Sequence, residues 1–478
     1  MDPPQNVPRA TLLALLLVSA GCAVGPNYKR PSASAPPAFK EEPPLNFKEA
    51  EAAGWKQSQP GDAYSKGRWW ELYNDAALNV LEEQVSISNQ NVLQAEAQYR
   101  QARAAVSVAR AALFPTAASS PAISAAGGPP PAGTRGTFNL PFNVAWEPDL
   151  WGNIRRGVTA SAATAQSLAA NLGNARLLYQ AELAQDYFGL HGNDGEAELL
   201  TRTEASYQEY LTLTRNRFSA GVASDLDVAQ AEAQLYQVQS QLQDLGVERT
   251  AFEHAIAILI GKAPAELTIP PIKLNTSPPP VPPGVPSELL ERRPDIASAE
   301  RQVAAANEQI GIAIAAFYPN LSLTGTGGVE STSVAKWFTW PSRFWSVGPQ
   351  LAETLFDAGR RHGVVEEQRA AYDATVAGYR ETVLTAMQQV EDNLAALRIL
   401  EREAGKVQQT VQAANRALDI SSAQYRSGTA GYLTVIVSQA TLLSADVTAV
   451  TLLTRRLTAS VLLIEALGGG WNVSQLSR

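Results

Sequence analysis

Few side chains in this sequence are suited to chemistry, and the first of them is its single cysteine, Cys22. Residues 10–18 form an apolar run that is too short to span a bilayer but has the length of a secretory signal's hydrophobic part. Small residues fill positions 19–21. This pattern favours a lipoprotein signal cut before Cys22, which then carries acyl chains such as palmitate, over an ordinary signal peptide with an incidental cysteine. Ala23 replaces the aspartate that retains lipoproteins at the inner membrane, which points to the outer membrane.

The other reactive residue types are not arranged as a catalytic, metal or cofactor site. His191, His254 and His362 lie far apart without ligand-type spacing, and Gly261-Lys262 lacks the other residues of a phosphate-binding loop. Charged residues make up 18% of the chain, the formal net charge is −8, and no basic cluster suits a nucleic-acid backbone. We therefore expect no enzyme, no metal, no cofactor and no nucleic-acid partner.

Two stretches without proline, residues 153–218 and 360–425, predict long helices that position everything else. In the second stretch apolar residues recur about every 3.6 positions. A helix of this length would reach roughly 100 Å, more than one globular core needs, so it must lie against helices of similar length. The pattern predicts a bundle or a tube, and it includes Tyr372, Val376, Tyr379, Val383, Met387, Val390, Leu394 and Leu397.

Between residues 138 and 146 the hydrophobic period changes to two, which predicts a β-strand. One side is apolar and the other polar, as in a membrane strand between lipid and a watery lumen, although a half-buried strand of a soluble sheet looks the same locally. Residues 321–324 and 345–351 alternate in the same way, and residues 113–125 form a weaker candidate. Glycine, proline and serine around residues 127–136 and 328–341 suit the tips of two hairpins.

The two halves of the chain resemble each other. Phe114-Pro115 matches Tyr318-Pro319 at an offset of 204, residues 150–156 match 355–361 at 205, and Gly221 matches Gly428 at 207. Each half therefore predicts helix, strand, strand, long helix, turn and helix. The predicted domains are a signal peptide (1–21), a lipid-anchored extended segment (22–74), a first repeat (75–277), a proline-rich linker (278–286), a second repeat (287–470) and a C-terminal tail (471–478).

Four strands cannot close a membrane barrel, because eight is the practical minimum and an open edge in lipid leaves backbone groups unpaired. The chain must therefore oligomerise. Three copies would supply twelve strands around a duct and six repeats around one axis. The expected fold is mainly α with some β: a trimeric 12-stranded transmembrane barrel continued by a long α-helical barrel.

Several motifs resemble those of the outer-membrane efflux proteins, the TolC-like export ducts. They are Cys22-Ala-Val-Gly-Pro-Asn-Tyr-Lys-Arg-Pro31, Trp69-Trp70-Glu71-Leu72, Ala109-Arg-Ala-Ala-Leu-Phe-Pro115, Leu290-Glu-Arg-Arg-Pro-Asp-Ile296 and Leu355-Phe-Asp-Ala-Gly-Arg360. The first motif resembles the lipoprotein subgroup that serves resistance-nodulation-division pumps. The resemblance implies a homotrimer in the outer membrane that exports drugs or other solutes passively, with a periplasmic adaptor protein and an inner-membrane pump as partners.

In that family the turns at the far end of the long helices form a periplasmic tip that docks the adaptor and closes the duct. The resemblance places the gate at Asp225, Asp227, Tyr425 and Leu433, and adaptor docking at Arg217, Gly221, Arg426 and Gly428. Ser224-x-x-Asp227 also has the form of a helix capping box, so these carboxylates have a structural role available. Val437 stands where relatives often carry an aspartate, which favours an apolar constriction by Leu433 over a carboxylate latch.

Two rival interpretations stay open on the sequence alone. The first is the outer-membrane duct of a type I protein secretion system. The second is a lipid-anchored coiled-coil scaffold without transport activity, which explains the long helices but not the four alternating strands. Heat-modifiable migration and the β-content of detergent-extracted protein would separate a duct from a scaffold.

Overall fold

The computed structural model describes residues 23–33, 36–41, 67–128, 135–281 and 286–476. The chain divides into two compact units, and each combines segments from both halves of the sequence. The first unit comprises Met1–Ser32, Gln98–Ala169 and Ser298–Arg380, and the second comprises Ala33–Ala97, Ala170–Ala297 and Glu381–Arg478. The predicted signal peptide and Cys22 lie outside the described residues.

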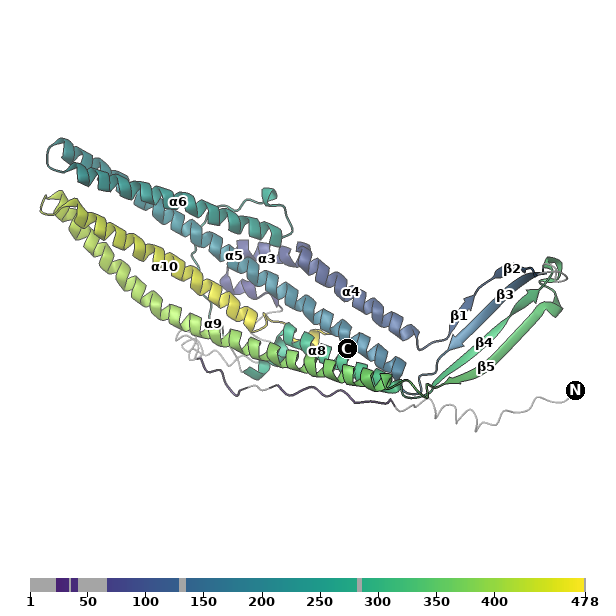
Figure 1. Cartoon of the computed structure of the whole chain (residues 1–478). Coiled ribbons are helices and arrows are strands. Elements are labelled where there is room, and N and C mark those ends of the chain that lie inside the picture. The colour runs from purple at the N-terminus through teal and green to yellow at the C-terminus, as the bar shows by residue number, and fades with distance from the viewer. Residues whose placement is uncertain (1–22, 34–35, 42–66, 129–134, 282–285, 477–478) are drawn as a thin grey trace. The chain divides into compact units, whose positions relative to one another are not determined.

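Long helices dominate the chain, as the proline-free stretches predicted (Figure 1). Helices α5 (Asn153–Ser219) and α9 (Arg360–Arg426) have 67 residues each. Each is followed by a helix of 35 residues, α6 (Asp225–Leu259) or α10 (Tyr432–Ala466). Helices α4 (Gln90–Ala111) and α8 (Pro294–Ala315) have 22 residues each. The predicted internal repeat is thus present in the lengths of the elements.

The element bounds also correct one of the sequence offsets. Helices α5 and α9 begin at residues 153 and 360 and end at 219 and 426, so they differ by 207 at both ends. Gly152 and Gly359, which precede them, both have positive φ, at 82° and 86°. The offset of 205 aligned residues 150–156 with 355–361 because their residue types are similar, but these positions are not equivalent in the backbone. The domain boundaries themselves stay a prediction.

The second unit contains a compact set of short helices. Asp75 caps α3 (Ala76–Ser88) by accepting hydrogen bonds from the amides of Ala77 and Leu78. The 3₁₀ helix η2 (Trp69–Tyr73) buries Trp69, and the Tyr73 ring packs 5.0 Å from that of Phe188 on α5. Further short elements are η3 (Pro264–Glu266), η4 (Pro286–Glu288), α7 (Leu289–Arg292) and η7 (Val473–Gln475).

The first unit contains one antiparallel sheet (Figure 1). Its strands lie in the order β1 (Thr116–Ser119), β3 (Arg135–Trp146), β4 (Asn320–Ser331), β5 (Arg343–Ala352), and β2 (Ala122–Ala126) also pairs with β3. The 3₁₀ turns η5 (Val334–Lys336) and η6 (Trp340–Ser342) connect β4 to β5. The predicted strands are confirmed, except that residues 113–125 form two short strands instead of one.

Two prolines lie at that break. Pro121 separates β1 from β2 in the chain, and Pro141 lies in β3 between the residues that pair with β1 and those that pair with β2. Proline has no N–H to offer a neighbouring strand, and here the Ser119 hydroxyl donates to the Pro141 carbonyl at 2.8 Å instead. On the other side Gly328 pairs with Pro141, and a Cβ there would lie 2.3 Å from the Leu140 carbonyl oxygen. Glycine thus permits the close approach of β4 to β3.

Candidate functional site

The sheet has one apolar and one polar face. In the register of β3, β4 and β5, Phe142 lies beside Gly327 and Trp345, and Val144 beside Gly325 and Val347. Because paired residues share a face, the large apolar side chains of these strands fall on one side, with Phe344 of β5 as the exception. They are Ile123, Phe138, Leu140, Phe142, Val144, Trp146, Leu321, Leu323, Val329, Trp345, Val347 and Leu351.

The opposite face carries the polar partners. Thr326 donates a hydrogen bond to Asn143 Oδ1 at 2.9 Å, and Asn139 pairs with Glu330 in the register. Trp345 and Val347 on the apolar face are 81% and 76% exposed, too much for the covered face of a soluble sheet. Within the described strands, neither β5 nor the β1–β2 edge has a second neighbour. The sheet thus has the two faces of a membrane barrel segment, and both of its edges are open.

The two tip turns have the same backbone geometry. Gly221 follows α5 and Gly428 follows α9, each with φ of 76°. In the first turn the amide of Val222 donates to the Arg217 carbonyl at 2.9 Å, and in the second the amide of Thr429 donates to the Gln424 carbonyl at 3.0 Å. These bonds close helix C-termini in the manner that a left-handed glycine permits. The two glycines therefore allow each long helix to reverse into its shorter companion.

The carboxylates of the first tip differ from each other. Asp227 completes the capping box of α6: its amide donates to Ser224 Oγ at 3.2 Å, and its Oδ2 accepts from the Ser224 amide at 2.9 Å. Asp225, in the same first turn, is exposed. The capping role predicted for Asp227 is confirmed, whereas Asp225 reaches solvent in the described chain. Either acid also suits the positive end of the helix dipole.

Arg217 and Tyr425 tie the two tips together. The Arg217 guanidinium lies 4.6 Å from the centre of the Tyr425 ring and donates through Nη1 to the Tyr425 carbonyl at 2.7 Å. The Tyr425 hydroxyl lies 3.1 Å from Thr214 Oγ1, and the side chain is only 3% exposed. Tyr425 is therefore a buried link between α5 and α9. We call this set of contacts the tip clasp.

A tyrosine-rich core supports the clasp. The Tyr432 ring packs 5.3 Å from the Tyr425 ring and 6.3 Å from that of Tyr210, whose hydroxyl donates to Ser422 Oγ at 2.5 Å. Burial, together with the nearby tyrosines, raises the pKa of Tyr432 well above its ordinary range, so this hydroxyl stays protonated. Apolar residues of α5, α6, α9 and α10 complete the cluster, among them Leu200, Leu211, Leu235, Val238 and Val435.

The remaining predicted tip residues are exposed. Leu433 and Val437, one turn apart at the start of α10, are 59% and 58% exposed. Arg426 makes a loose ion pair with Glu209 at 3.5 Å, with both side chains mostly in solvent. Such a pair contributes little to stability. The structure thus brings Arg217 and Tyr425 together and leaves Leu433 free to project from the tip.

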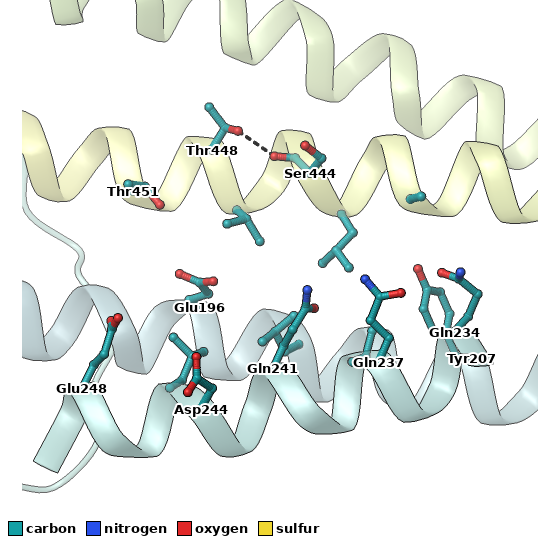
Figure 2. Close-up of a pocket in the computed structure, with 16 residues that line it drawn as sticks. Glu196, Tyr207, Gln234, Gln237, Gln241, Asp244, Glu248, Ser444, Thr448 and Thr451 are labelled. Carbon is teal, nitrogen blue, oxygen red and sulfur yellow. Dashed lines mark hydrogen bonds between the residues drawn. The ribbon is translucent and has the colours of Figure 1, made fainter. Parts of the chain in front are cut away.

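A groove of about 600 Å³ runs between α6 and α10 behind the tip (Figure 2). Gln234, Gln237 and Gln241 line it from α6, and Ser444 and Thr448 are among the residues that line it from α10. Glu196 of α5, with Asp244 and Glu248 of α6, makes the other end acidic. The groove thus combines amides, hydroxyls and carboxylates with apolar residues such as Leu443 and Val447.

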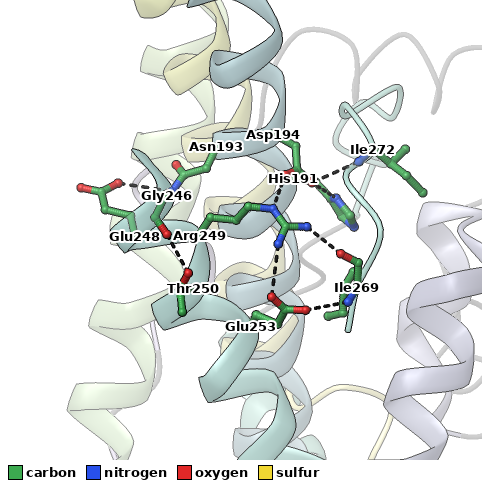
Figure 3. A network of polar contacts seen from close by, with 10 residues as sticks. All are labelled: His191, Asn193, Asp194, Gly246, Glu248, Arg249, Thr250, Glu253, Ile269 and Ile272. Atoms are coloured by element: carbon green, nitrogen blue, oxygen red, sulfur yellow. Dashed lines mark hydrogen bonds and ion pairs between the residues drawn. The ribbon is translucent and has the colours of Figure 1, made fainter. Parts of the chain in front are cut away.

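A buried polar network holds residues 269–272 against α5 and α6 (Figure 3). Asp194 accepts a hydrogen bond from Arg249 Nε at 2.6 Å and pairs with His191 Nδ1 at 2.9 Å. Burial alone would raise the pKa of Asp194, but the hydrogen bonds from His191, Arg249 and a backbone amide lower it. The ionised carboxylate therefore stabilises this attachment above the unfolded pKa of about 3.9, and the contribution is lost as the pH falls through the lower folded value.

Sequence reasoning missed several of these residues. Tyr207, Tyr210, Thr214 and Arg217 follow each other at spacings of three and four, which places them on one face of α5. That stripe was the available signal for the tyrosine core and the clasp. The links between Asp194 on α5, Arg249 on α6 and residues 269–272 left no such signal, because only the fold brings these segments together. Among the described residues, no group of three or more acidic, histidine or cysteine side chains is placed to hold a metal ion.

A sheet with one apolar face, one polar face and open edges, in a chain that also contains two helices of 67 residues, is typical of membrane ducts. The family model described as "Outer membrane efflux protein" matches residues 81–262 and 285–469. The chain belongs to this family, whose members are channels and not enzymes. The family resemblance seen in the sequence motifs is therefore confirmed, and so is the mainly helical fold with a small sheet.

Individual relatives cover nearly the whole chain. "Outer membrane protein OprJ" of Pseudomonas aeruginosa is 32% identical over 97% of this chain and 95% of its own length. "Solvent efflux pump outer membrane protein SrpC" of Pseudomonas putida is 30% identical over 96% and 98%. Among solved structures, the outer-membrane channel OprN matches with a TM-score of 0.84 and 29% identity, covering 94% of this chain and all of that one.

Proposed function

We propose that this chain is the outer-membrane channel component of a tripartite efflux system and that it passively exports drugs or other small solutes. Membership of the outer membrane efflux protein family carries this proposal. Relatives over nearly the whole chain are named as parts of pumps for antibiotics, toluene and solvents. A periplasmic adaptor and an inner-membrane pump would be its partners. The names of the relatives do not favour the type I secretion alternative.

The working channel would be a homotrimer in the outer membrane. The exposed apolar face of the four-strand-wide sheet suits contact with lipid. Its two open edges do not, because their backbone groups stay unpaired in lipid unless the sheet closes into a barrel. Three copies give twelve strand positions and a lumen lined by the polar face. Purified protein in a planar bilayer should show discrete conductance steps. The detergent-extracted protein should also migrate differently on gels before and after heating. A scaffold would give neither, which would refute the channel.

The lipid anchor fits the described start of the chain. Val24, two residues after Cys22, donates its amide to the Trp151 carbonyl at 3.1 Å, and its own carbonyl accepts from Arg156 Nε at 2.7 Å. Trp151 follows β3 by five residues, counting from Trp146. Two residues span at most about 7 Å, so acyl chains on Cys22 would begin close to this end of the sheet. We infer that the chain belongs to the lipoprotein subgroup.

Replacing the cysteine tests the anchor directly. Cys22→Ser should abolish incorporation of labelled palmitate, because no other thiol is present in the chain. The matched control is Ser19→Ala, which keeps the acceptor and should still be labelled. Label retained in Cys22→Ser would exclude acylation at this position. Lost label with unchanged export would mean that the lipid is dispensable once the sheet is inserted.

The tip residues would dock the adaptor and close the duct. Gly221 and Gly428 shape the turns, while Arg217 and Arg426 add positive charge to them. Leu433, exposed and repeated three times about the trimer axis, would form an apolar constriction that excludes water. Asp225 remains available for a charged latch, whereas Asp227 is engaged in the capping box.

A polar replacement separates the two kinds of gate. Leu433→Ser should rehydrate the constriction and raise single-channel conductance without the pump, with greater sensitivity of cells to large antibiotics. Asp225→Asn with Asp227→Asn should raise conductance less and should lower helix stability by about 0.5–2 kcal/mol through the weakened cap. If the double Asn variant raised the conductance in planar bilayers more than Leu433→Ser did, the gate would be electrostatic and not apolar.

A further inference from the structure

The connection between β4 and β5 is a folded aromatic loop, residues 332–342. Since β4 follows α8 and β5 precedes α9, the aromatic loop lies at the end of the sheet away from both helices, here called the outer end. The Trp337 ring packs 5.6 Å from the Phe138 ring and 4.9 Å from the Phe338 ring. Its Nε1 also donates to the Val329 carbonyl at 3.3 Å. Because Phe138 belongs to the apolar face, the aromatic loop is held beside that face.

An arginine lies on the apolar face next to the aromatic loop. Arg343, the first residue of β5, pairs with Val329 in the register, so it shares the face of Trp345. Its guanidinium lies 4.0 Å from the centre of the Trp340 ring, and Trp340 is 76% exposed. Stacking on a ring leaves the N–H groups at the edge of the guanidinium free to bind another group. A base with available donors thus faces the same side as the apolar side chains.

The depth of Arg343 matches the border of a bilayer. Arg343 and Leu351 are eight positions apart on β5. At about 3.3 Å per residue this is about 26 Å along the strand, or roughly 20 Å along the membrane normal at the usual strand tilt. The apolar band of a membrane barrel is about 25 Å tall and ends in aromatic girdles. Arg343 and Trp340 therefore lie at the level of lipid headgroups.

The outer end of the sheet is positively charged, although the formal net charge of the chain is −8. Arg135 is the one charged residue in positions 113–146, and positions 320–352 contain Glu330, Lys336 and Arg343. Arg135 begins β3, Arg343 begins β5, and Lys336 ends η5 in the aromatic loop. Glu330 pairs with Asn139 on the polar face. The apolar face at the outer end therefore carries a base without an acid, which suits an anionic partner.

The apolar face also has room for an acyl chain beside Arg343. Gly327 of β4 lies between Phe142 of β3 and Trp345 of β5, and Gly325 follows on the same face. A Cβ on Gly327 would come no closer than 3.8 Å to an atom outside its own neighbours, so no close backbone contact requires a glycine there. The two glycines thus leave space between larger apolar side chains.

We propose that Arg343, stacked on Trp340, binds the phosphate of an anionic lipid in the outer leaflet, with an acyl chain of the same lipid lying along Gly327 and Gly325. This inference rests on the proposed channel in the outer membrane and adds a specific ligand to it. A guanidinium offers two parallel N–H donors to one phosphate, and the Trp340 ring fixes its plane. The phosphate in turn neutralises a base that otherwise faces lipid. Lys336 adds a second positive charge at the same loop.

Native mass spectrometry of the detergent-solubilised protein tests the site, with purified lipid A as the probe. Wild-type protein should retain phosphorylated lipid A and lose most of it when the dephosphorylated form is used. Arg343→Ala should lower retention about tenfold, because it removes a charge-assisted contact. Arg343→Lys should lower it less, since an ammonium keeps the charge but neither stacks nor binds in a bidentate way.

The matched control is Arg135→Ala. Arg135 is also an exposed base at the outer end, but it lies three positions before Phe138 and therefore on the polar face. Retention of lipid A should be unchanged in this variant. Equal retention of the two forms of lipid A, or equal loss in Arg135→Ala and Arg343→Ala, would overturn the site.

Two further measurements separate a lipid from a free ion. Gly327→Leu fills the space beside Trp345 and should lower the retention of lipid A, because the acyl chain loses its position. Inorganic phosphate in excess should not displace lipid A, since it gains nothing from the apolar face. Displacement by inorganic phosphate, or unchanged retention in Gly327→Leu, would mean that Arg343 does not hold a lipid.

Conductance distinguishes this inference from the proposed function. If the lipid site is wrong, wild-type protein should still give discrete conductance steps in bilayers without lipid A, and the channel would stand. Retention of lipid A by a protein that never conducts would support the site and refute the channel.

Discussion

Val144→Arg should impair insertion of the channel into the outer membrane. Val144 lies on the apolar face of β3, two residues before the strand ends at Trp146, between Gly325 of β4 and the β1 edge, and its side chain is 45% exposed. An arginine on a barrel's lipid face costs about 2–4 kcal/mol per chain at the bilayer midplane and less toward the interfaces. In a trimer three such charges enter the bilayer together. Heat-modifiable trimers in outer-membrane fractions should fall to a small part of the wild-type amount.

The neighbouring residue provides the control. Asn143 is one position away on the same strand but on the polar face, where it accepts the hydrogen bond of Thr326. Asn143→Arg loses that bond yet keeps its charge in a watery lumen, so insertion should be nearly normal. Equal damage from both substitutions would mean that the apolar face packs against protein instead of lipid, and the membrane assignment of the sheet would fail.

The sequence was sufficient for the features that depend on local periodicity. The 67-residue helices and the alternating strands follow from unbroken patterns of 3.6 and 2, and turn residues separate them. Asp75 and Ser224 were identifiable as helix caps because capping depends on residues at most three positions away. The family motifs further indicated which turns form the periplasmic tips and that the chain resembles export ducts.

Features that depend on distant pairing were not predictable in the same way. The tip clasp joins residues 208 positions apart, and no property of Arg217 alone indicates Tyr425 as its partner. Pro121 marks the break between β1 and β2 in the sequence, but the position of Pro141 opposite that break follows only from the register. Likewise, each compact unit draws on both repeats, so a division along the chain could not anticipate it.

Arg217→Ala should release the second tip turn from the first and give the largest opening of any tip variant. The guanidinium donates a charge-assisted hydrogen bond to the carbonyl that ends α9, worth about 1.5–3 kcal/mol, and its stacking on Tyr425 adds about 0.5–2 kcal/mol. Alanine removes both, and the Tyr425 carbonyl then keeps only the hydrogen bond from the Gly428 amide at 3.1 Å. Channel conductance in planar bilayers should rise, and cells should become sensitive to antibiotics too large for the closed duct.

Two conservative variants distinguish the clasp from a general loss of stability. Tyr425→Phe keeps the ring and the backbone carbonyl and loses only the contact of the hydroxyl with Thr214, so conductance should rise little. Arg217→Lys keeps the charge but not the planar guanidinium that stacks and donates at once, so it should fall between wild type and Arg217→Ala. Because Leu433 lies outside the clasp, Arg217→Ala with Leu433→Ser should open the duct further than either alone. A wild-type conductance for Arg217→Ala in correctly folded trimers would show that the clasp does not hold the gate and that the apolar ring closes the tip unaided.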